Sequence, residues 1–310
     1  MSISILKTGP LATIQDLGRY DGAQWGVPLA GVMDIPASLI GNLLVGNSPE
    51  LATLEITLGG FSARFECDTV IALTGAVAPA TLDKQPIGCW RNVPVRAGQK
   101  LKIDFAPAGA RIYLSVSGGV DVPMVLGARA TDLAGHFGGL NGRALRAGDV
   151  VPLGQPTGPA PDAQVRAPDR GDVLRVLPAT EWSAFSPAAQ QALLTEPWRV
   201  TPDANRMGAN LAGPVLELGQ PLDLSSHAVQ PGVLQVPPSG HPILLLPDAQ
   251  TTGGYPKIAQ VIRADLWRTG QFRPGDTMRF VEVTLEQALA ALAEQRRWLA
   301  QLENQLKWRV

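Results

Sequence analysis

The stretch 241-HPILLLPDAQTTGGYPKIAQVIRADL-266 joins two apolar segments through a polar, glycine-containing insert. Its first segment is an apolar run of the length of a buried strand, and a second apolar segment begins after Lys257. Binding residues concentrate in loops that rigid strands hold at both ends. The stretch therefore predicts a β-rich fold with a ligand pocket at the end of a strand.

Short apolar runs bounded by Gly, Pro or Asp recur along the whole chain. The 33 glycines and 27 prolines fall singly between these runs, which is typical of turn-rich β structure. The pattern predicts a mainly β protein. The runs are SISIL, TLEITL, SARFE, TVIALTG, KLKIDFA, RIYLSVSG and DVVPLG in the first half, then DVLRVLP, WRVTP, GVLQVPP, PILLLP, AQVIRADL and DTMRFVEV in the second.

Three segments follow a helical period instead. Residues 33–47 carry apolar side chains at helical spacing after Pro36, a residue suited to a first helical turn. A second short helix is predicted at 186–194, SPAAQQALL. Residues 284–310 begin with a capping-box pattern and repeat leucines at helical spacing, which predicts one long amphipathic helix. Its apolar stripe is predicted to pack on its own domain, with a partner surface as the alternative.

The chain length favours two lobes. At 310 residues and 32.8 kDa, the chain exceeds the size at which one hydrophobic core usually keeps growing. We expect an N-terminal β lobe at 1–153, a proline-rich connection at 154–171, a C-terminal β lobe at 172–283 and the C-terminal helix at 284–310.

Charge is low and evenly spread. Charged residues make up 17% of the chain and the formal net charge is −1, so no nucleic-acid partner is predicted. No apolar stretch reaches the length of a membrane span, and Cys67 and Cys89 are interpreted as two reduced core thiols. These features predict a soluble, cytoplasmic protein with no membrane partner.

Several common catalytic motifs are missing from the sequence. It has no GxxxxGK[ST] phosphate loop, no GxGxxG opening a helix after a strand, no HExxH and no GxSxG. Its three histidines, His136, His227 and His241, are isolated, without an acid pair at ligand spacing. We therefore expect no metal in this chain.

The polar insert holds the main candidates for a site. Lys257 is the only lysine between Lys102 and Lys307, and a lysine can bind a carboxylate or phosphate or act in acid–base chemistry. The alternative is a Gly-rich hairpin turn with Tyr255 folded over it. Near Lys257 lie a carboxylate, three neutral hydrogen-bonding side chains and two glycines that let backbone approach a ligand: Asp248, Gln250, Thr251, Thr252, Gly253 and Gly254.

Further candidates are scattered over the rest of the chain. Glu55 lies within an apolar strand, where a carboxylate must be paired or functional. Asp34 and Arg129 lie in glycine-rich polar stretches, and Arg206 is predicted either to pair with Asp203 or to hold an anion. Ion pairing within the fold is the alternative for both arginines.

Eight ordered blocks, from about Lys7 to Phe280, resemble one known family. It is the biotin-dependent carboxyltransferase-like family, also called allophanate hydrolase subunit 2 or the KipA type, to which the C subunit of bacterial 5-oxoprolinase belongs. The blocks are TIQDLGR, GVMD, NLLVGN, LEITLGG, SGGVDVPMVLGARAT, GGLNGRALRAGD, NRMGANL and DAQTTGGYPKIAQVIRADL.

The resemblance implies two cyclophilin-like β-barrel lobes with a few short helices, in a protein that works as a heteromer. Its partners would be the KipI-type and the LamB/YcsF-type subunits of the complex. The complex would convert 5-oxoproline, ATP and water to glutamate, ADP and phosphate. ATP would bind through the complex, and this chain would be inactive alone.

Two alternatives to this function stay open. One is a carboxyltransferase component of a biotin-dependent urea or amide carboxylase, with biotin as its cofactor. The other is a non-enzymatic KipA-type antagonist of a kinase inhibitor.

The resemblance also implies a pocket for a small planar amide or lactam, in which Lys257 would hold a carboxylate, phosphate or developing oxyanion. Two positions depart from the family pattern, because GSRST is GARAT here and Ala249 replaces a common Arg. Lys257 and Asp248 are the catalytic candidates. The substrate-binding candidates are Gln250, Thr251, Thr252, Gly253, Gly254, Tyr255, Gln235, Arg206, Asp34, Glu55 and Arg129.

Overall fold

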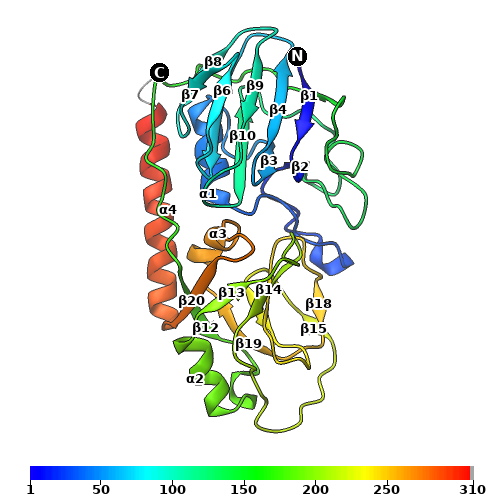
Figure 1. The fold of residues 1–310 in the computed structure, drawn as a ribbon, viewed down its shortest axis with the longest axis vertical. Helices are drawn as coiled ribbons and strands as arrows, with labels where there is room; N and C mark the ends of the chain where they lie inside the picture. Colours follow the sequence, from blue (N-terminus) through cyan, green and yellow to red (C-terminus); the bar gives the residue numbers. More distant parts are fainter. Residues whose placement is uncertain (308–310) are drawn as a thin grey trace. The chain divides into compact units, whose positions relative to one another are not determined.

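The structure, a computed structural model, describes residues 1–307 and confirms the mainly β prediction (Figure 1). The chain divides into two compact units, and residues 154–169 of the predicted connection belong to the first. The first unit comprises Met1–Asp21, Ala30–Asp169 and the chain from Trp298 onward, and the second comprises Gly22–Leu29 and Arg170–Arg297.

The first unit is built from two antiparallel β-sheets. Their strands are β1 (Ser2–Thr8), β2 (Leu11–Gln15), β3 (Thr53–Thr57), β4 (Phe61–Phe65), β5 (Thr69–Gly75), β6 (Ala80–Leu82), β7 (Gln85–Ile87), β8 (Asn92–Val95), β9 (Lys100–Ile103), β10 (Arg111–Val116) and β11 (Val150–Pro152). One sheet has the order β11-β1-β4-β9-β6-β7, and the other has the order β2-β3-β10-β5-β8.

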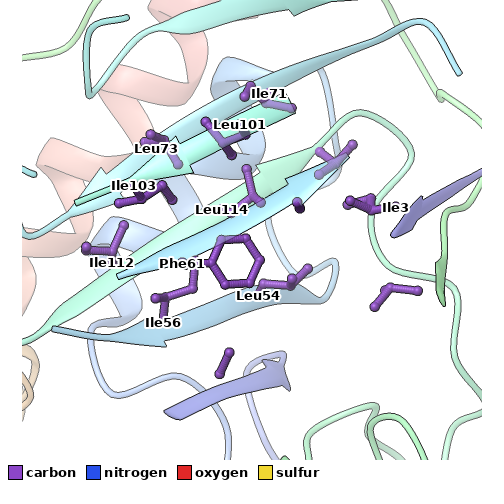
Figure 2. Packing of buried hydrophobic residues seen from close by; sticks show 14 of the residues in the cluster. Ile3, Leu54, Ile56, Phe61, Ile71, Leu73, Leu101, Ile103, Ile112 and Leu114 are labelled. Atoms are coloured by element: carbon purple, nitrogen blue, oxygen red, sulfur yellow. The ribbon is translucent and has the colours of Figure 1, made fainter. Parts of the chain in front are cut away.

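The hydrophobic core of the first unit lies between these two sheets (Figure 2). Side chains alternate along a strand, so β10 sends Ile112 and Leu114 into this core while Tyr113 points to the opposite face. The Phe61 ring and Ile103 fill the same layer from the facing sheet, and all of these side chains are fully buried. Burial of each stabilises the fold by about 1.5–3 kcal/mol.

Helix α1 (Ile35–Leu44) packs on the other face of the five-stranded sheet, against β5 and β10. It begins where the sequence predicted. The carboxylate of Asp34 accepts the Ala37 N–H at 3.0 Å as the N-cap, and Pro36 occupies the first turn. These two residues explain why a helix interrupts the run of strands.

A buried carboxylate ties the segment before α1 to the sheet. Glu55 Oε2 accepts the Met33 N–H at 2.9 Å and the Tyr113 hydroxyl at 2.8 Å, and the same hydroxyl oxygen accepts the Asp34 N–H at 2.8 Å. The Arg111 guanidinium lies 3.7 Å from Glu55 Oε1. Burial, together with the Glu55 and Asp34 charges, raises the pKa of Tyr113 well above its usual range.

The second unit is a closed seven-stranded barrel. Its strands are β12 (Val173–Pro178), β13 (Trp198–Val200), β14 (Gly208–Ala212), β16 (Val233–Gln235), β17 (Ile243–Leu245), β19 (Lys257–Val261) and β20 (Thr277–Glu282). The order β12-β19-β16-β17-β14-β13-β20 closes through parallel pairing of β12 with β20. Closure leaves this sheet without unpaired edges.

Smaller elements surround the barrel strands. A two-stranded ribbon joins β15 (His227–Ala228) to β18 (Thr252–Gly253). The helix predicted at 186–194 is confirmed as α2 (Pro187–Thr195), and short helical turns η1 (Ala23–Trp25), η2 (Trp182–Ala184), η3 (Arg263–Asp265) and α3 (Leu266–Thr269) complete the unit.

The run AQVIRADL was predicted as one strand, but β19 ends at Val261 and η3 and α3 follow. The reason is Asp265, whose buried carboxylate accepts the Arg175 backbone N–H at 3.0 Å and its guanidinium at 2.9 and 2.7 Å. A carboxylate removed from water needs such donors, and the chain turns to reach them. The strands absent from the prediction are β2, β6, β7, β8, β14, β15 and β18.

Helix α4 (Leu285–Lys307) confirms the long C-terminal helix; residues 308–310 of the predicted segment lie outside the described residues. Its capping box is reciprocal, because Thr284 N–H donates to Gln287 Oε1 at 2.9 Å and Gln287 N–H donates to Thr284 Oγ1 at 3.2 Å. None of the helices within residues 1–307 is long and apolar enough to span a membrane.

The apolar stripe of α4 is only partly covered. In the second unit Ala288 and Ala291 are buried, and in the first unit Leu306 is buried. Leu285 and Leu289 are 62% and 58% exposed. The predicted packing on the protein's own core therefore holds for the alanines and for Leu306, but not for these two leucines.

Replacing Ser186 by Ala should lower the free energy of unfolding by about 1 kcal/mol, because Ser186 Oγ accepts the Ala189 N–H at 3.1 Å as the N-cap of α2. The thermal midpoint, followed by circular dichroism, should fall by about 2–4 °C. Ser186→Asp keeps the acceptor and should keep the midpoint. An equal fall in both variants would contradict a capping role.

Replacing Tyr113 by Phe should cost about 1–3 kcal/mol, because the Asp34 N–H and Glu55 lose a buried partner. The raised pKa of Tyr113 favours the folded state below about pH 10, the pKa of an unfolded Tyr, and this contribution is lost as pH rises further. The stability difference between wild type and Tyr113→Phe should therefore narrow above about pH 10. Urea unfolding on both sides of this pH measures the difference, and a constant gap would refute the assignment.

Candidate functional site

Strand pairing in the second unit joins three predicted site residues and one histidine in two pairs. Gln235, the last residue of β16, pairs with Lys257, the first residue of β19, after an irregularity in the register. In the adjoining ribbon His227 of β15 pairs with Gly253 of β18. Within the polar insert, Thr252 and Gly253 therefore form the short strand β18, and Gly253 lies close to the Gln235 side chain.

Lys257 is the charged centre of this group. Its side chain is 5% exposed, and its Nζ lies 3.9 Å from Glu181 Oε2, 3.3 Å from His227 Nδ1 and 2.5 Å from His227 Nε2. Burial lowers the pKa of Lys257, and the Glu181 charge opposes that shift. A buried ammonium with a lowered pKa next to a specific charge partner is typical of functional sites.

Glu181 and His227 complete the group, and neither was among the predicted site residues. Glu181 precedes η2, and its Oε2 also accepts the Lys257 backbone N–H at 2.9 Å. Its Oε1 lies 3.6 Å from His227 Nε2. Nothing local in the sequence marks either residue, because the contacts form between segments that are far apart along the chain.

Gln250 and Gly253 of the polar insert lie next to the Gln235 side chain. Gln250 Nε2 donates to Gln235 Oε1 at 3.2 Å. Gln235 is buried, and within residues 1–307 its Nε2 has no hydrogen-bond partner. A Cβ at Gly253 would lie 2.5 Å from that Nε2, so a larger residue there would displace the Gln235 amide. An unsatisfied buried amide donor of this kind calls for an acceptor.

Arg206 and Asp248 bind each other. The guanidinium donates from Nε to Asp248 Oδ2 and from Nη2 to Asp248 Oδ1, both at 2.8 Å, and both side chains are buried. The Asp248 backbone N–H also donates to the Arg206 carbonyl at 3.0 Å. Arg206 was predicted to pair with Asp203 or to hold an anion, and its observed bidentate partner is Asp248 instead.

The remaining residues of the insert are more open. The Thr251 carbonyl accepts the Val229 N–H at 2.9 Å, and Thr252 is exposed. Gly254 approaches the segment before β15, where a Cβ would meet Ser226 Oγ at 3.4 Å. Tyr255 is 47% exposed, so its ring is available at the surface of the second unit.

Three candidates, Asp34, Glu55 and Arg129, belong to the first unit. Asp34 caps α1, and Glu55 accepts the hydrogen bonds described above, so both have structural partners. The Arg129 guanidinium donates to the Val122 carbonyl at 2.8 Å and to the Asp121 carboxylate at 3.3 Å. Each of these side chains therefore has hydrogen-bond partners within its own unit.

The Lys257 group combines one buried ammonium, an imidazole, a carboxylate and an amide donor. Such a set suits a carbonyl oxygen on which negative charge develops, because preorganised donors stabilise that charge most when water is excluded. Within the described residues there is no group of three His, Cys, Asp or Glu side chains that could hold a metal ion. We refer below to Glu181, His227, Gln235 and Lys257 as the Lys257 cluster.

Comparison with known proteins extends over nearly the whole chain. Residues 25–282 match the family described as carboxyltransferase domain, subdomain A and B. The chain is 42% identical to the C subunit of 5-oxoprolinase from Escherichia coli (strain K12), over 99% of this chain and 98% of that protein. It is also 42% identical to the C subunit of 5-oxoprolinase from Haemophilus influenzae, over 92% of this chain and 93% of that protein.

A solved structure shares the fold. The crystal structure of the K. lactis urea amidolyase matches with a TM-score of 0.90 at 29% identity, covering 97% of this chain but only 20% of that much longer chain. The family match covers most of the residues, and the two bacterial relatives match nearly end to end. This chain therefore belongs to the carboxyltransferase domain family, subdomain A and B.

Proposed function

We propose that this chain is the C subunit of an ATP-dependent 5-oxoprolinase, a hydrolase complex that opens a cyclic amide. The observation that carries the proposal is the 42% identity, over 99% of the chain, to a protein named as that subunit. Its partners would be the KipI-type and the LamB/YcsF-type subunits, in the cytoplasm. The chain would be inactive without them.

The chemistry of the Lys257 cluster supports a lactam as the ligand. A lactam presents a carbonyl oxygen beside an N–H, and its carbonyl oxygen becomes more negative when water adds to the carbon. Lys257 Nζ would stabilise that oxygen, and Gln235 Nε2 would supply a second donor. The Gln250 side chain, exposed next to Gln235, would accept the lactam N–H through its own carbonyl oxygen.

Asp248 takes a positioning role in this proposal rather than a catalytic one. Both of its carboxylate oxygens accept hydrogen bonds from Arg206, which leaves them poorly placed to take a proton from a ligand. The pair instead fixes the segment between β17 and β18 from which the polar insert projects. Removing either partner would leave a buried charge uncompensated.

The Lys257 cluster does not fit a nucleotide triphosphate. Triphosphates are held by several cations or by a run of backbone N–H groups. Here Lys257 faces Glu181, and Arg206 faces Asp248, so the two buried cations of the second unit are already balanced by carboxylates. We therefore assign ATP binding to another part of the complex.

A second candidate function is a carboxyltransferase component of a biotin-dependent urea or amide carboxylase. The observation that favours it is the TM-score of 0.90 to the K. lactis urea amidolyase. Urea and the ureido ring of biotin present the same carbonyl and N–H edge as a lactam, so the donors and acceptors of the Lys257 cluster would serve either ligand.

Release of glutamate from 5-oxoproline and ATP tests the first function. The purified chain is combined with its KipI-type and LamB/YcsF-type partners, and each protein is then omitted in turn. We expect glutamate only when all three are present. No release from a folded and associated complex would overturn the 5-oxoprolinase assignment and favour the carboxylase or the regulatory alternative.

Replacing Lys257 by Met should lower kcat/KM of the complex by about 10²–10³-fold, the usual effect of losing one group that stabilises an oxyanion. Met keeps an apolar stem of similar length, so binding to the partner proteins and the circular dichroism spectrum should be unchanged. Lys7→Met, on an exposed position of β1, is the matched control and should keep full activity. Wild-type turnover in Lys257→Met would remove Lys257 from the mechanism.

A further inference from the structure

We propose that Glu181 and His227 are positioning residues that keep the Lys257 ammonium charged and aimed at the ligand oxygen. The inference deepens the proposed function and rests on it for the identity of the ligand. Two titratable groups face Lys257 Nζ: Glu181 from the turn before η2, and His227 from β15. Neither was found from the sequence, and both reach the same nitrogen.

The geometry assigns the tautomer of His227. Its Nδ1 lies 3.1 Å from the Ser225 carbonyl oxygen, which can only accept a hydrogen bond, so Nδ1 carries the hydrogen. Nε2 then presents its lone pair, and Lys257 Nζ lies 2.5 Å from it. The neutral imidazole therefore accepts one ammonium hydrogen and fixes the direction in which the other two point.

Glu181 acts on the charge of Lys257 rather than on its direction. Its Oε2 already accepts the Lys257 backbone N–H at 2.9 Å, so the carboxylate is held against the start of β19. The same oxygen lies 3.9 Å from Nζ, too far for a strong hydrogen bond but close enough for electrostatic attraction in a buried place. That attraction opposes the effect of burial, which lowers the pKa of Lys257.

His227 is the member of the group that meets solvent. Its side chain is 42% exposed, whereas Lys257 and Glu181 are 5% and 8% exposed. A ligand can therefore reach the cluster from the side of His227, and Lys257 must be protonated to donate to a ligand oxygen there.

The first measurement follows Lys257 directly by NMR on the purified chain. With ¹³C-labelled lysine, the Lys257 signal is identified by its absence in Lys257→Arg, since the other lysines are Lys7, Lys84, Lys100, Lys102 and Lys307. In Glu181→Gln the side-chain amide still accepts the backbone N–H but carries no charge. The titration midpoint of Lys257 should fall by about 1 pH unit or more, because the negative charge of Glu181, which favours the ammonium form, is gone. An unchanged midpoint would overturn the role of Glu181.

The second measurement is the tautomer of His227, read from ¹⁵N shifts of the imidazole ring at neutral pH. The chain has 3 histidines, so His227→Gln assigns the signal. We expect the hydrogen on Nδ1. A hydrogen on Nε2 would overturn the role of His227, because no lone pair would then face Lys257.

The third measurement is the pH profile of the assembled complex. Glu181→Gln should move the alkaline limb of the activity–pH profile to lower pH. In the Lys257→Arg background, Glu181→Gln should no longer move that limb, because Arg does not titrate in this range. His227→Gln keeps a hydrogen-bond acceptor near Lys257 Nζ, whereas His227→Leu removes it, so kcat/KM should fall more in His227→Leu. A uniform loss at every pH in Glu181→Gln, or equal losses in the two His227 variants, would mean a merely structural role and would refute the proposal.

Surface residues of the same types in the second unit provide the controls. Glu196→Gln, after α2, and His241→Gln, before β17, change exposed side chains and should alter neither the Lys257 titration nor the pH profile. Failure of the wild-type complex to release glutamate would count against the proposed function alone. The NMR results would still decide whether Glu181 and His227 control Lys257.

Discussion

A buried ammonium needs an opposite charge and a hydrogen-bond acceptor within reach, and the site in the barrel depends on how Lys257 obtains both. Glu181 supplies the charge and His227 the acceptor. The same Glu181 oxygen also binds the backbone N–H of Lys257, so one carboxylate fixes the strand and the charge that the strand carries. Position and protonation of Lys257 are thereby coupled, and the fold itself sets the place of the ammonium at the proposed site.

Two buried glutamates, Glu55 and Glu181, have different surroundings in the two units. Glu55 in the first unit is 1% exposed and receives a backbone N–H and a Tyr hydroxyl, with Arg111 nearby. Its neighbours all belong to the folded core, so it binds α1 to the sheet. Glu181 has a single backbone donor and two titratable neighbours, one of which is partly exposed. The Glu181 arrangement thus includes an imidazole that solvent can reach, whereas Met33, Tyr113 and Arg111 beside Glu55 are all buried.

The sequence predicted elements well where one segment carries its own signal. Helix α1 was found because Pro36 and the apolar spacing lie within residues 33–47, and α4 was found because its cap and its stripe are contiguous. The run after β19 was misjudged because the partner of Asp265 is Arg175, which lies on β12, 90 residues earlier in the chain. Short strands such as β7 and β8 contain Pro, which argues against a strand in any local reading.

Some residues of the candidate site were predicted from the sequence and others were not. Lys257, Gln235 and Gly253 were chosen from local composition and the family resemblance, and the pairing of β16, β18 and β19 with their neighbours brings them together. Glu181 is 76 residues from Lys257 and His227 is 30 residues away, so only the closed barrel reveals that they share one nitrogen. Arg206 and Asp248 were both singled out as charges, but their bond to each other could not be read from a separation of 42 residues.

Charge balance narrows the kind of ligand that this site can take. Lys257 and Arg206, the two buried cations of the second unit, each face one carboxylate, so this part of the barrel carries little excess charge for a polyanion. A neutral amide, lactam or ureido group enters such a site without a large desolvation cost and develops its charge only as the carbonyl carbon changes. Under the proposed function, Lys257, held as an ammonium, would interact more strongly with the reacting oxygen than with the resting one. Binding that strengthens as the reaction proceeds is what accelerates a chemical step, and a charge-balanced site around one buried ammonium is suited to provide it.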